Sequence, residues 1–319
     1  MKVLIIGTGN IAHKHYKNIK KNFKATIKFY KRSNKYFNNK IPKKKIIFNL
    51  SSAKKFDADF LIICSPATKH FADILNFYNK KIKIFIEKPL FHNTDKLVFF
   101  YNYKDYFKYM RVGYQLRYND ILVFLKKILK KNLFGEILSV QIYCGQNLKD
   151  WRKNFSYRRS VSSLKKFGGG VVNELSHEID IALWLFGKPT ETFANLRKLS
   201  NLNIDVEDYA VINFFYKTKT VNIILDMFNC SKQRFIKIIF EKKTINVDLI
   251  KGQITQFSKK NDTKIIYKTK IKDPYSQQII SFIKQDKYPF FATIRESIDV
   301  INVINSIKVS SKKKKIIQI

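Results

Sequence analysis

Apolar residues follow two different patterns along the chain. In the first third they form short runs, unbroken at 3–6 and nearly continuous at 58–64 and 82–86, which are typical of parallel strands covered on both faces. From 191 to 271 apolar and polar residues alternate with period two, which predicts antiparallel strands with one wetter face. We therefore expect an α/β protein whose two parts are built on different sheets.

The change of pattern also predicts where the two parts meet. A strand at 109–114 closes the first part, and helical spacing begins at 119 with no Gly- or Ser-rich linker before it. We expect two closely joined domains, a Rossmann doubly wound parallel sheet at 1–118 and an α+β domain at 119–319. Two helical patterns near the end of the chain complete the second domain.

The first apolar run ends in a glycine turn, Gly7-x-Gly9-x-x-Ala12, and an amphipathic helix pattern follows it. A glycine at the first position permits the sharp turn, and one at the second lets the backbone approach a pyrophosphate. The free N–H groups of the following helix then face that anion. The turn predicts dinucleotide binding, with contacts from Gly7, Gly9, Asn10, Ile11 and Ala12.

The end of the second predicted strand, at 25–30, bears on which dinucleotide is preferred. NAD usually requires an Asp or Glu there to hold the ribose 2′-hydroxyl. This chain has Lys31, Arg32 and Ser33 instead, and an Arg with a hydroxyl suits a 2′-phosphate better. We expect NAD(P) binding with NADP(H) favoured. The alternative is that Lys31 and Arg32 belong to a general basic surface.

Polar residues also follow the next predicted strands, at the sheet edge where such folds bind ligands. Lys88 could hydrogen-bond a substrate hydroxyl and favour a developing alkoxide, or it could merely pair with Glu87 at a turn. Thr68 is placed to start a helix, and His70 could cap, lie on the surface or contact the cofactor. The further predicted cofactor contacts are Ser65, Pro66, His70, Glu87, Lys88 and Gln115.

A second stretch with chemical potential, at 168–187, starts with three glycines and continues with helical spacing that Gly187 ends. Glu174 and His177 are three residues apart, so one helix would project them from the same face. His177 can exchange a proton near neutral pH and is the best candidate for a catalytic base. The competing interpretation is a histidine satisfied within the core.

Three of these motifs, GTGNIA, SPATKH and EKPL, occur in an order and spacing that resemble the glucose–fructose oxidoreductase/inositol dehydrogenase (Gfo/Idh/MocA) family of NAD(P)-dependent sugar oxidoreductases. The resemblance implies a second domain with a large, mostly antiparallel sheet that often mediates oligomer formation. A homodimer or homotetramer is the expected assembly. The combination DWR, YRRS, GGG, ELSHEID and WLFG is most similar to members encoded among surface-polysaccharide and nonulosonic-acid biosynthesis genes.

The same resemblance implies a catalytic set of Lys88, Glu174 and His177. Many members carry an Asp four residues before the histidine, whereas this chain has Asn173 there and Glu174 three before. Glu174 could therefore hold a sugar hydroxyl or orient His177.

Arginine is scarce, at nine of the 62 basic residues, so its positions are informative. Five of the nine lie at 111–159, where a planar fork could bind a carboxylate or phosphate. This predicts an anionic substrate, such as an acidic or nucleotide-linked sugar; ion pairs between domains or subunits are the alternative. The predicted substrate contacts are Arg117, Arg152, Tyr157, Arg158, Asn173, Glu174 and His177.

The net charge of +38 comes mostly from lysines spread over the whole chain, without a local basic patch. We expect no specific nucleic-acid partner. The sequence has no long apolar run or signal pattern, and its three scattered cysteines do not form a metal or disulfide set, so a cytoplasmic protein without membrane or metal is expected. The predicted function is hydride transfer between a nicotinamide and a sugar carbon. The alternative is a non-catalytic sensor of NADP(H) or a sugar nucleotide.

Overall fold

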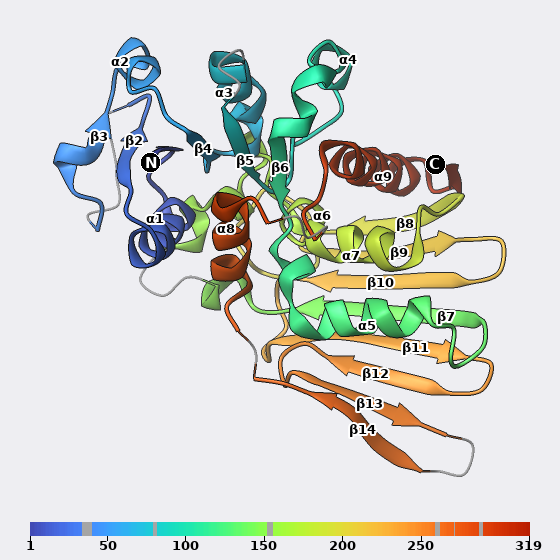
Figure 1. The fold of residues 1–319 in the computed structure, drawn as a ribbon. Coiled ribbons are helices and arrows are strands. Elements are labelled where there is room, and N and C mark those ends of the chain that lie inside the picture. Colours follow the sequence, from blue (N-terminus) through green and yellow to red (C-terminus); the bar gives the residue numbers. More distant parts are fainter. Residues whose placement is uncertain (34–39, 79–81, 152–155, 259–261, 271, 287–289) are drawn as a thin grey trace. The chain divides into compact units, whose positions relative to one another are not determined.

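The computed structural model describes the chain apart from residues 34–39, 79–81, 152–155, 259–261, 271 and 287–289 (Figure 1). It divides into two compact units, of which the first comprises Met1–Tyr118 and Asp273–Ile298 and the second comprises Asn119–Lys272 and Asp299–Ile319. The second domain is therefore not the continuous segment 119–319 that the sequence predicted.

A six-stranded sheet forms the centre of the first unit, and every strand pair in it is parallel. Its spatial order is β3-β2-β1-β4-β5-β6. Successive strands are added on one side of β1 up to β3 and on its other side from β4, so the order of the strands reverses between β1 and β4. In such sheets ligands bind beyond the carboxyl ends of the strands at that reversal. The strands are β1 (Lys2–Ile6), β2 (Thr26–Tyr30), β3 (Ile46–Ile47), β4 (Phe60–Ile63), β5 (Lys83–Glu87) and β6 (Met110–Gly113).

The helices of this unit surround strands whose apolar residues are almost fully buried, as the apolar runs predicted. They are α1 (Asn10–Asn22), α2 (Leu50–Lys55), α3 (His70–Phe77), α4 (Leu97–Tyr101) and α8 (Pro274–Lys284). The expectation that Thr68 starts a helix is wrong. The Lys69 amide bonds the Pro66 carbonyl at 2.8 Å and closes a short 3₁₀ turn, and α3 begins only at His70.

The return of 273–298 to the first unit has a physical cause. Helix α8 packs on α1 and on the 3₁₀ turn at Gln115–Tyr118, where the Tyr118 hydroxyl donates to Ser281 Oγ at 3.1 Å. The Val112 amide at the sheet edge bonds the Ala292 carbonyl at 3.1 Å. These contacts join residues more than 160 positions apart, which periodicity does not report.

The second unit is built on a nine-stranded sheet with the order β14-β13-β12-β11-β7-β10-β9-β8-β15. It is mostly antiparallel, as predicted, and only β7 and β10 run parallel among the pairs that the structure describes. Its strands are β7 (Ile137–Gly145), β8 (Glu191–Arg197), β9 (Tyr209–Phe215), β10 (Thr220–Asp226), β11 (Gln233–Phe240), β12 (Thr244–Asp248), β13 (Gln253–Phe257), β14 (Thr263–Lys268) and β15 (Ile317–Gln318).

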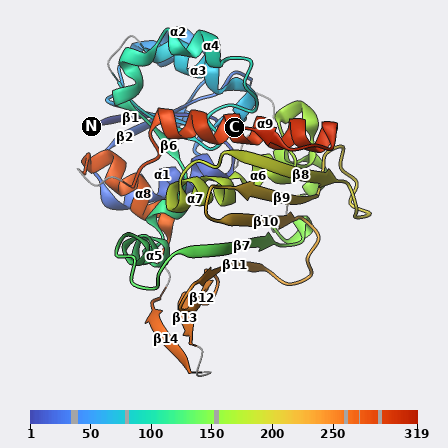
Figure 2. The same cartoon turned by 90° about the vertical axis from the view of Figure 1, so that its right-hand side faces the viewer.

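Helices α5 (Asp120–Lys130) and α7 (Ser176–Phe186) lie on the same face of this sheet (Figures 1 and 2). A short helix, α6 (Val171–Glu174), precedes α7, and α9 (Ile294–Lys313) continues from the first unit into the second. The lysine run at 312–315 is followed by β15, which pairs with β8 and forms an edge of the sheet. Ser310 supports this return by donating to the Lys315 carbonyl at 2.7 Å.

Within the described residues, no helix is long and apolar enough to cross a bilayer. No group of three or more His, Cys, Asp or Glu in that part of the chain is arranged to hold a metal ion. Cys64, Cys144 and Cys230 are free cysteines.

Candidate functional site

The glycine turn after β1 has a geometry suited to a dinucleotide. Gly7 has φ of +100°, and a Cβ there would lie 2.9 Å from the Cys64 carbonyl oxygen, so only glycine fits without strain. Gly9 is the N-cap residue of α1, and a Cβ on it would meet nothing within 4 Å. Gly9 has no side chain that could cover the start of the helix, and the first turn contains no acid. Open space beside a helix N-terminus fits a pyrophosphate.

A polar network stands at the ends of β2 and β4, where the ribose end of the cofactor was predicted to bind. Arg32 Nη2 donates to Asp73 Oδ1, and the Ser65 hydroxyl donates to Asp73 Oδ2 at 2.6 Å. Burial raises the pKa of Asp73, while its bonds to Ser65 and Arg32 favour the charged form. Arg32 and Ser65 were predicted, whereas Asp73 was missed because it lies on α3 rather than after a strand.

Glu87 ends β5 and is engaged by a residue that sequence reasoning missed. His15 Nε2 lies 2.6 Å from Glu87 Oε1, and both side chains are buried. His15 is three residues after Ala12 on the buried face of α1, so a histidine at an apolar position of that helix was the available signal. Lys88 follows Glu87 directly and is half-buried.

Three other predicted residues of the first unit are buried, and two of them make internal polar contacts. His70 lies within 2.8 Å of the Ser65 carbonyl through Nε2 and within 3.1 Å of the Pro89 and Leu90 carbonyls through Nδ1, and burial lowers its pKa. Arg117 is 1% exposed and donates to Glu296 at 2.8 Å. Gln115 is also buried. These contacts give His70 and Arg117 structural roles, and the ligand contacts of all three stay predictions.

In the second unit the predicted catalytic stretch is two helices rather than one. Leu175 separates α6 from α7 with φ of −96° and ψ of 27°, so the expectation that Glu174 and His177 share a face of one helix is wrong. His177 stands in the first turn of α7 and is 5% exposed. Glu174 ends α6 and accepts a hydrogen bond from the Ser162 hydroxyl at 2.8 Å.

The triple glycine packs tightly against the preceding loop. A Cβ on Gly169 would lie 2.5 Å from the Val161 carbonyl oxygen, which explains the need for glycine. Asn173 Nδ2 donates to the Gly168 carbonyl at 2.9 Å and so fastens α6 to this loop. The residue that replaces the family's Asp therefore has a structural contact of its own.

Two ionisable residues far away in sequence support the same helix. Lys308, on α9, donates to Asn173 Oδ1 at 3.0 Å. The backbone carbonyl of Glu207 accepts from the Val171 amide at 3.0 Å. The carboxylate of Glu207 packs against Gly170, where a Cβ would lie only 2.3 Å from Oε1. Burial raises the pKa of Glu207 and lowers that of Lys308, and each counteracts the shift of the other. No sequence pattern indicated Glu207 or Lys308.

Helix α7 is fixed to the sheet by an ion pair with strand β11. Glu178 accepts from Arg234 Nε at 2.6 Å, and this carboxylate is 1% exposed. Cys144 lies beside the pair, and burial raises its pKa to about 12. This ion pair holds the helix whose first turn carries His177, and Cys144 is an inert core thiol.

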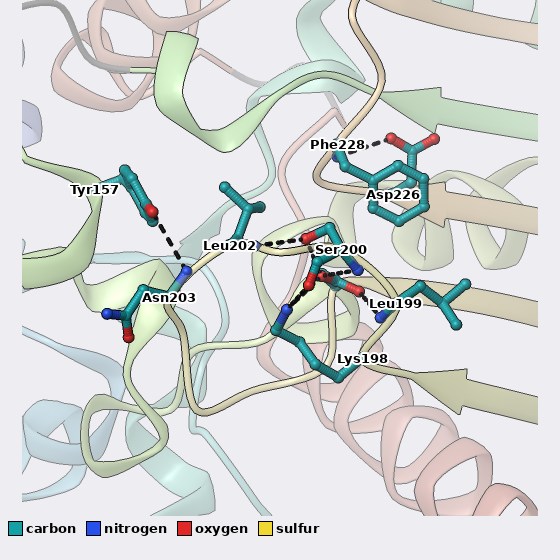
Figure 3. Close-up of polar contacts among 9 residues, drawn as sticks. Tyr157, Lys198, Leu199, Ser200, Leu202, Asn203, Asp226 and Phe228 are labelled. Carbon is teal, nitrogen blue, oxygen red and sulfur yellow. Dashed lines mark hydrogen bonds and ion pairs between the residues drawn. The ribbon is translucent and has the colours of Figure 1, made fainter.

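The remaining predicted substrate contacts lie before the glycines. Tyr157 is half-buried and its hydroxyl accepts from the Asn203 amide at 3.3 Å (Figure 3), and Arg158 is exposed. Arg152 lies outside the described residues. The loop that carries Asn203 is organised by Asp208, which accepts from the Leu199 amide at 2.7 Å and from the Ser200 hydroxyl at 2.5 Å.

Known proteins resemble this chain in both units. A family model described as oxidoreductase family, NAD-binding Rossmann fold matches residues 1–99, and the GFO/IDH/MocA C-terminal domain matches residues 123–246. Glucose-6-phosphate 3-dehydrogenase of Bacillus subtilis is 29% identical over 176 residues, which are 51% of this chain and 49% of that protein. The chain thus spans about half the length of this relative.

Solved structures extend the likeness to the whole fold. The WlbA dehydrogenase of Bordetella pertussis, in complex with NADH and UDP-GlcNAcA, has a TM-score of 0.77 at 18% identity and covers 100% of this chain and 98% of its own. The UDP-N-acetylglucosamine 3-dehydrogenase GnnA of Acidithiobacillus ferrooxidans has a TM-score of 0.76 at 14% identity and covers 98% of each chain. At these identities the likeness shows a shared fold.

Proposed function

Because this chain belongs to the GFO/IDH/MocA oxidoreductase family, whose NAD-binding Rossmann domain forms its first unit, we propose that it is an NAD(P)-dependent oxidoreductase acting on a CH–OH group of a sugar derivative. The observation that carries the proposal is the open glycine turn at Gly9, directly before α1. The residues that hold the cofactor are those of 7–12 together with Arg32 and the loop at Ser65–Pro66. When bound, NAD(P) supplies the hydride acceptor or donor.

The proposed substrate is an anionic sugar, either phosphorylated or linked to a nucleotide. The B. subtilis relative is named for a sugar phosphate, and the Bordetella structure contains a nucleotide sugar. Exposed cationic side chains at Arg158, Lys165 and Lys166, beside the glycine loop, suit an anion. A role in surface-polysaccharide metabolism is part of this proposal.

Proton transfer is assigned to His177. Its imidazole accepts the hydroxyl proton during oxidation and returns it during reduction. Lys88 polarises the substrate oxygen with its ammonium. Glu174 binds a substrate hydroxyl and, through Ser162, keeps the preceding loop against the start of α7.

NADP(H) is the proposed preferred cofactor, because Arg32 stands two residues after β2 with a side chain that is 38% exposed. A sensor that binds the cofactor without turnover is the competing function. A base at His177 has no purpose in a sensor, so the two proposals differ in what that residue does.

We also propose a homodimer or homotetramer formed through the sheet of the second unit. On the face away from α7, Val211, Ile224, Tyr143 and Phe235 are in register on four neighbouring strands and are only partly buried. A row of this kind is better covered by a second copy than left in water. Light scattering should give a multiple of the 37.8 kDa chain mass, and Ile224→Glu should reduce it. A monomeric wild type would contradict this proposal.

The catalytic proposal is tested by screening cofactor turnover with phosphorylated and nucleotide-linked sugars, and then by replacing the base. His177→Ala should lower kcat by ~10² to 10⁴ while cofactor affinity, measured by fluorescence titration, stays near that of the wild type. Thermal melting would confirm that the variant is folded. Unchanged turnover in the variant would remove His177 from the mechanism, and cofactor binding without turnover of any sugar would favour the sensor.

A further inference from the structure

The acid that usually selects NAD at the end of the second strand is absent from this chain, but a different acid occupies the same neighbourhood. Asp73, from α3, is completely buried and binds Arg32 through one oxygen and Ser65 through the other. An acid after the strand would face the ribose and accept its 2′-hydroxyl. Asp73 is withdrawn from solvent, so it acts on a ligand through the residues that it binds, and of these Arg32 carries a charge.

The ion pair fixes Arg32 without covering it. Its side chain is 38% exposed, and its guanidinium lies 6.0 Å from the centroid of the Tyr30 ring. A guanidinium has five N–H donors, and the bond to Asp73 uses one at Nη2. The group is therefore oriented and retains donors for a phosphate, while a carboxylate in contact with it offsets its charge.

Continuing from the proposed function, we propose that Asp73 is the specificity-determining residue of the cofactor site: it weakens the preference for a 2′-phosphate that Arg32 creates, so that the protein accepts both NADP and NAD. Ser65 keeps Asp73 in place by satisfying its second oxygen at 2.6 Å. The pair of Asp73 and Arg32 thus replaces the single acid used in NAD-specific sites.

Binding measurements test this without requiring turnover. Isothermal titration with NAD⁺ and NADP⁺ gives the ratio of their dissociation constants. Comparing the affinities for adenosine 2′,5′-bisphosphate and 5′-AMP then isolates the contribution of the 2′-phosphate. Asp73→Asn keeps an oxygen for Arg32 and removes the charge, so affinity for NADP⁺ relative to NAD⁺ should rise about tenfold. Asp73→Ser removes the same charge and gives the same expectation, and thermal melting identifies folded variants.

Two further variants separate a change at this site from a change in overall charge. Asp95→Asn removes an exposed negative charge from the same unit and should leave the ratio unchanged. Arg32→Ala should reduce the preference for NADP⁺ at least tenfold, and adding Asp73→Asn to it should have no further effect if Asp73 acts through Arg32.

The outcomes distinguish this inference from the function it rests on. A rise in NADP⁺ preference that disappears in the Arg32→Ala background supports it. An unchanged or lower ratio in folded Asp73→Asn, with both cofactors still bound by the wild type, overturns it and leaves the proposed function standing. A wild type that binds neither cofactor overturns both.

Discussion

The two units differ in how far apart in the sequence their important residues lie. In the first unit the glycine turn is a local feature, in which three consecutive positions, 7–9, join the end of β1 to the start of α1. In the second unit α6 is supported by Ser162, Glu207 and Lys308, which come from a loop, the segment before β9 and the last helix. A dinucleotide site can thus be encoded locally, whereas this candidate proton-transfer site is assembled by distant contacts.

The largest effects are expected at Gly7 and Gly9, which test whether the local turn contains both a structural and a ligand-facing glycine. Gly7→Ala should destabilise the protein by about 2–4 kcal/mol, because the residue has φ of +100° and the new Cβ would lie 2.9 Å from backbone. Gly9 has φ of −75°, and its Cβ position is open. Gly9→Ala should therefore change the stability by less than about 1 kcal/mol while cofactor affinity falls. Urea unfolding and cofactor titration measure the two effects.

Equal losses of stability in the two variants would mean that the turn has no division between a structural and a ligand-facing glycine. The same loss of cofactor affinity in both, without loss of stability in either, would contradict the steric account of Gly7.

The same contrast explains what the sequence could predict. The parallel and antiparallel sheets followed from runs and alternation, and the glycine turn followed from residue type and spacing. The break at Leu175 did not, because helical spacing continues through 171–186 although the backbone leaves the helical conformation at that residue. Asp73, His15 and Lys308 were missed because each gains its role from a partner 41, 72 or 135 positions away.

Lys308 provides a sharper test of the distant support in the second unit. Lys308→Met should destabilise the protein by roughly 1–3 kcal/mol, because Asn173 Oδ1 loses a charged donor and the buried Glu207 loses a favourable charge. Lys312→Met, an exposed position on the same helix, is the matched control and should have little effect.

The effect of Lys308→Met should also depend on pH. Burial raises the folded pKa of Glu207 above its unfolded value, so its contribution to stability is complete below the unfolded pKa and is lost as the pH rises through the folded one. Lys308 counteracts that loss, and its removal should therefore cost more at pH 8 than at pH 5. Chemical denaturation across this range gives the difference, and a cost independent of pH would show that Glu207 does not respond to Lys308.

The loop around Asp208 is a part of the second unit that is organised by local contacts, in contrast to α6. Burial opposes its ionisation, but hydrogen bonds from Ser200, Leu199 and Lys198 outweigh this and lower its pKa. Its contribution to stability is thus present above the unfolded pKa and is lost as the pH falls through the folded one. Asp208→Asn should cost about 1 kcal/mol at pH 7, and the difference from the wild type should begin to narrow as the pH falls below about 4, the pKa of an unfolded Asp. A difference that does not narrow at all on further acidification would mean that Asp208 supports the loop through shape rather than charge.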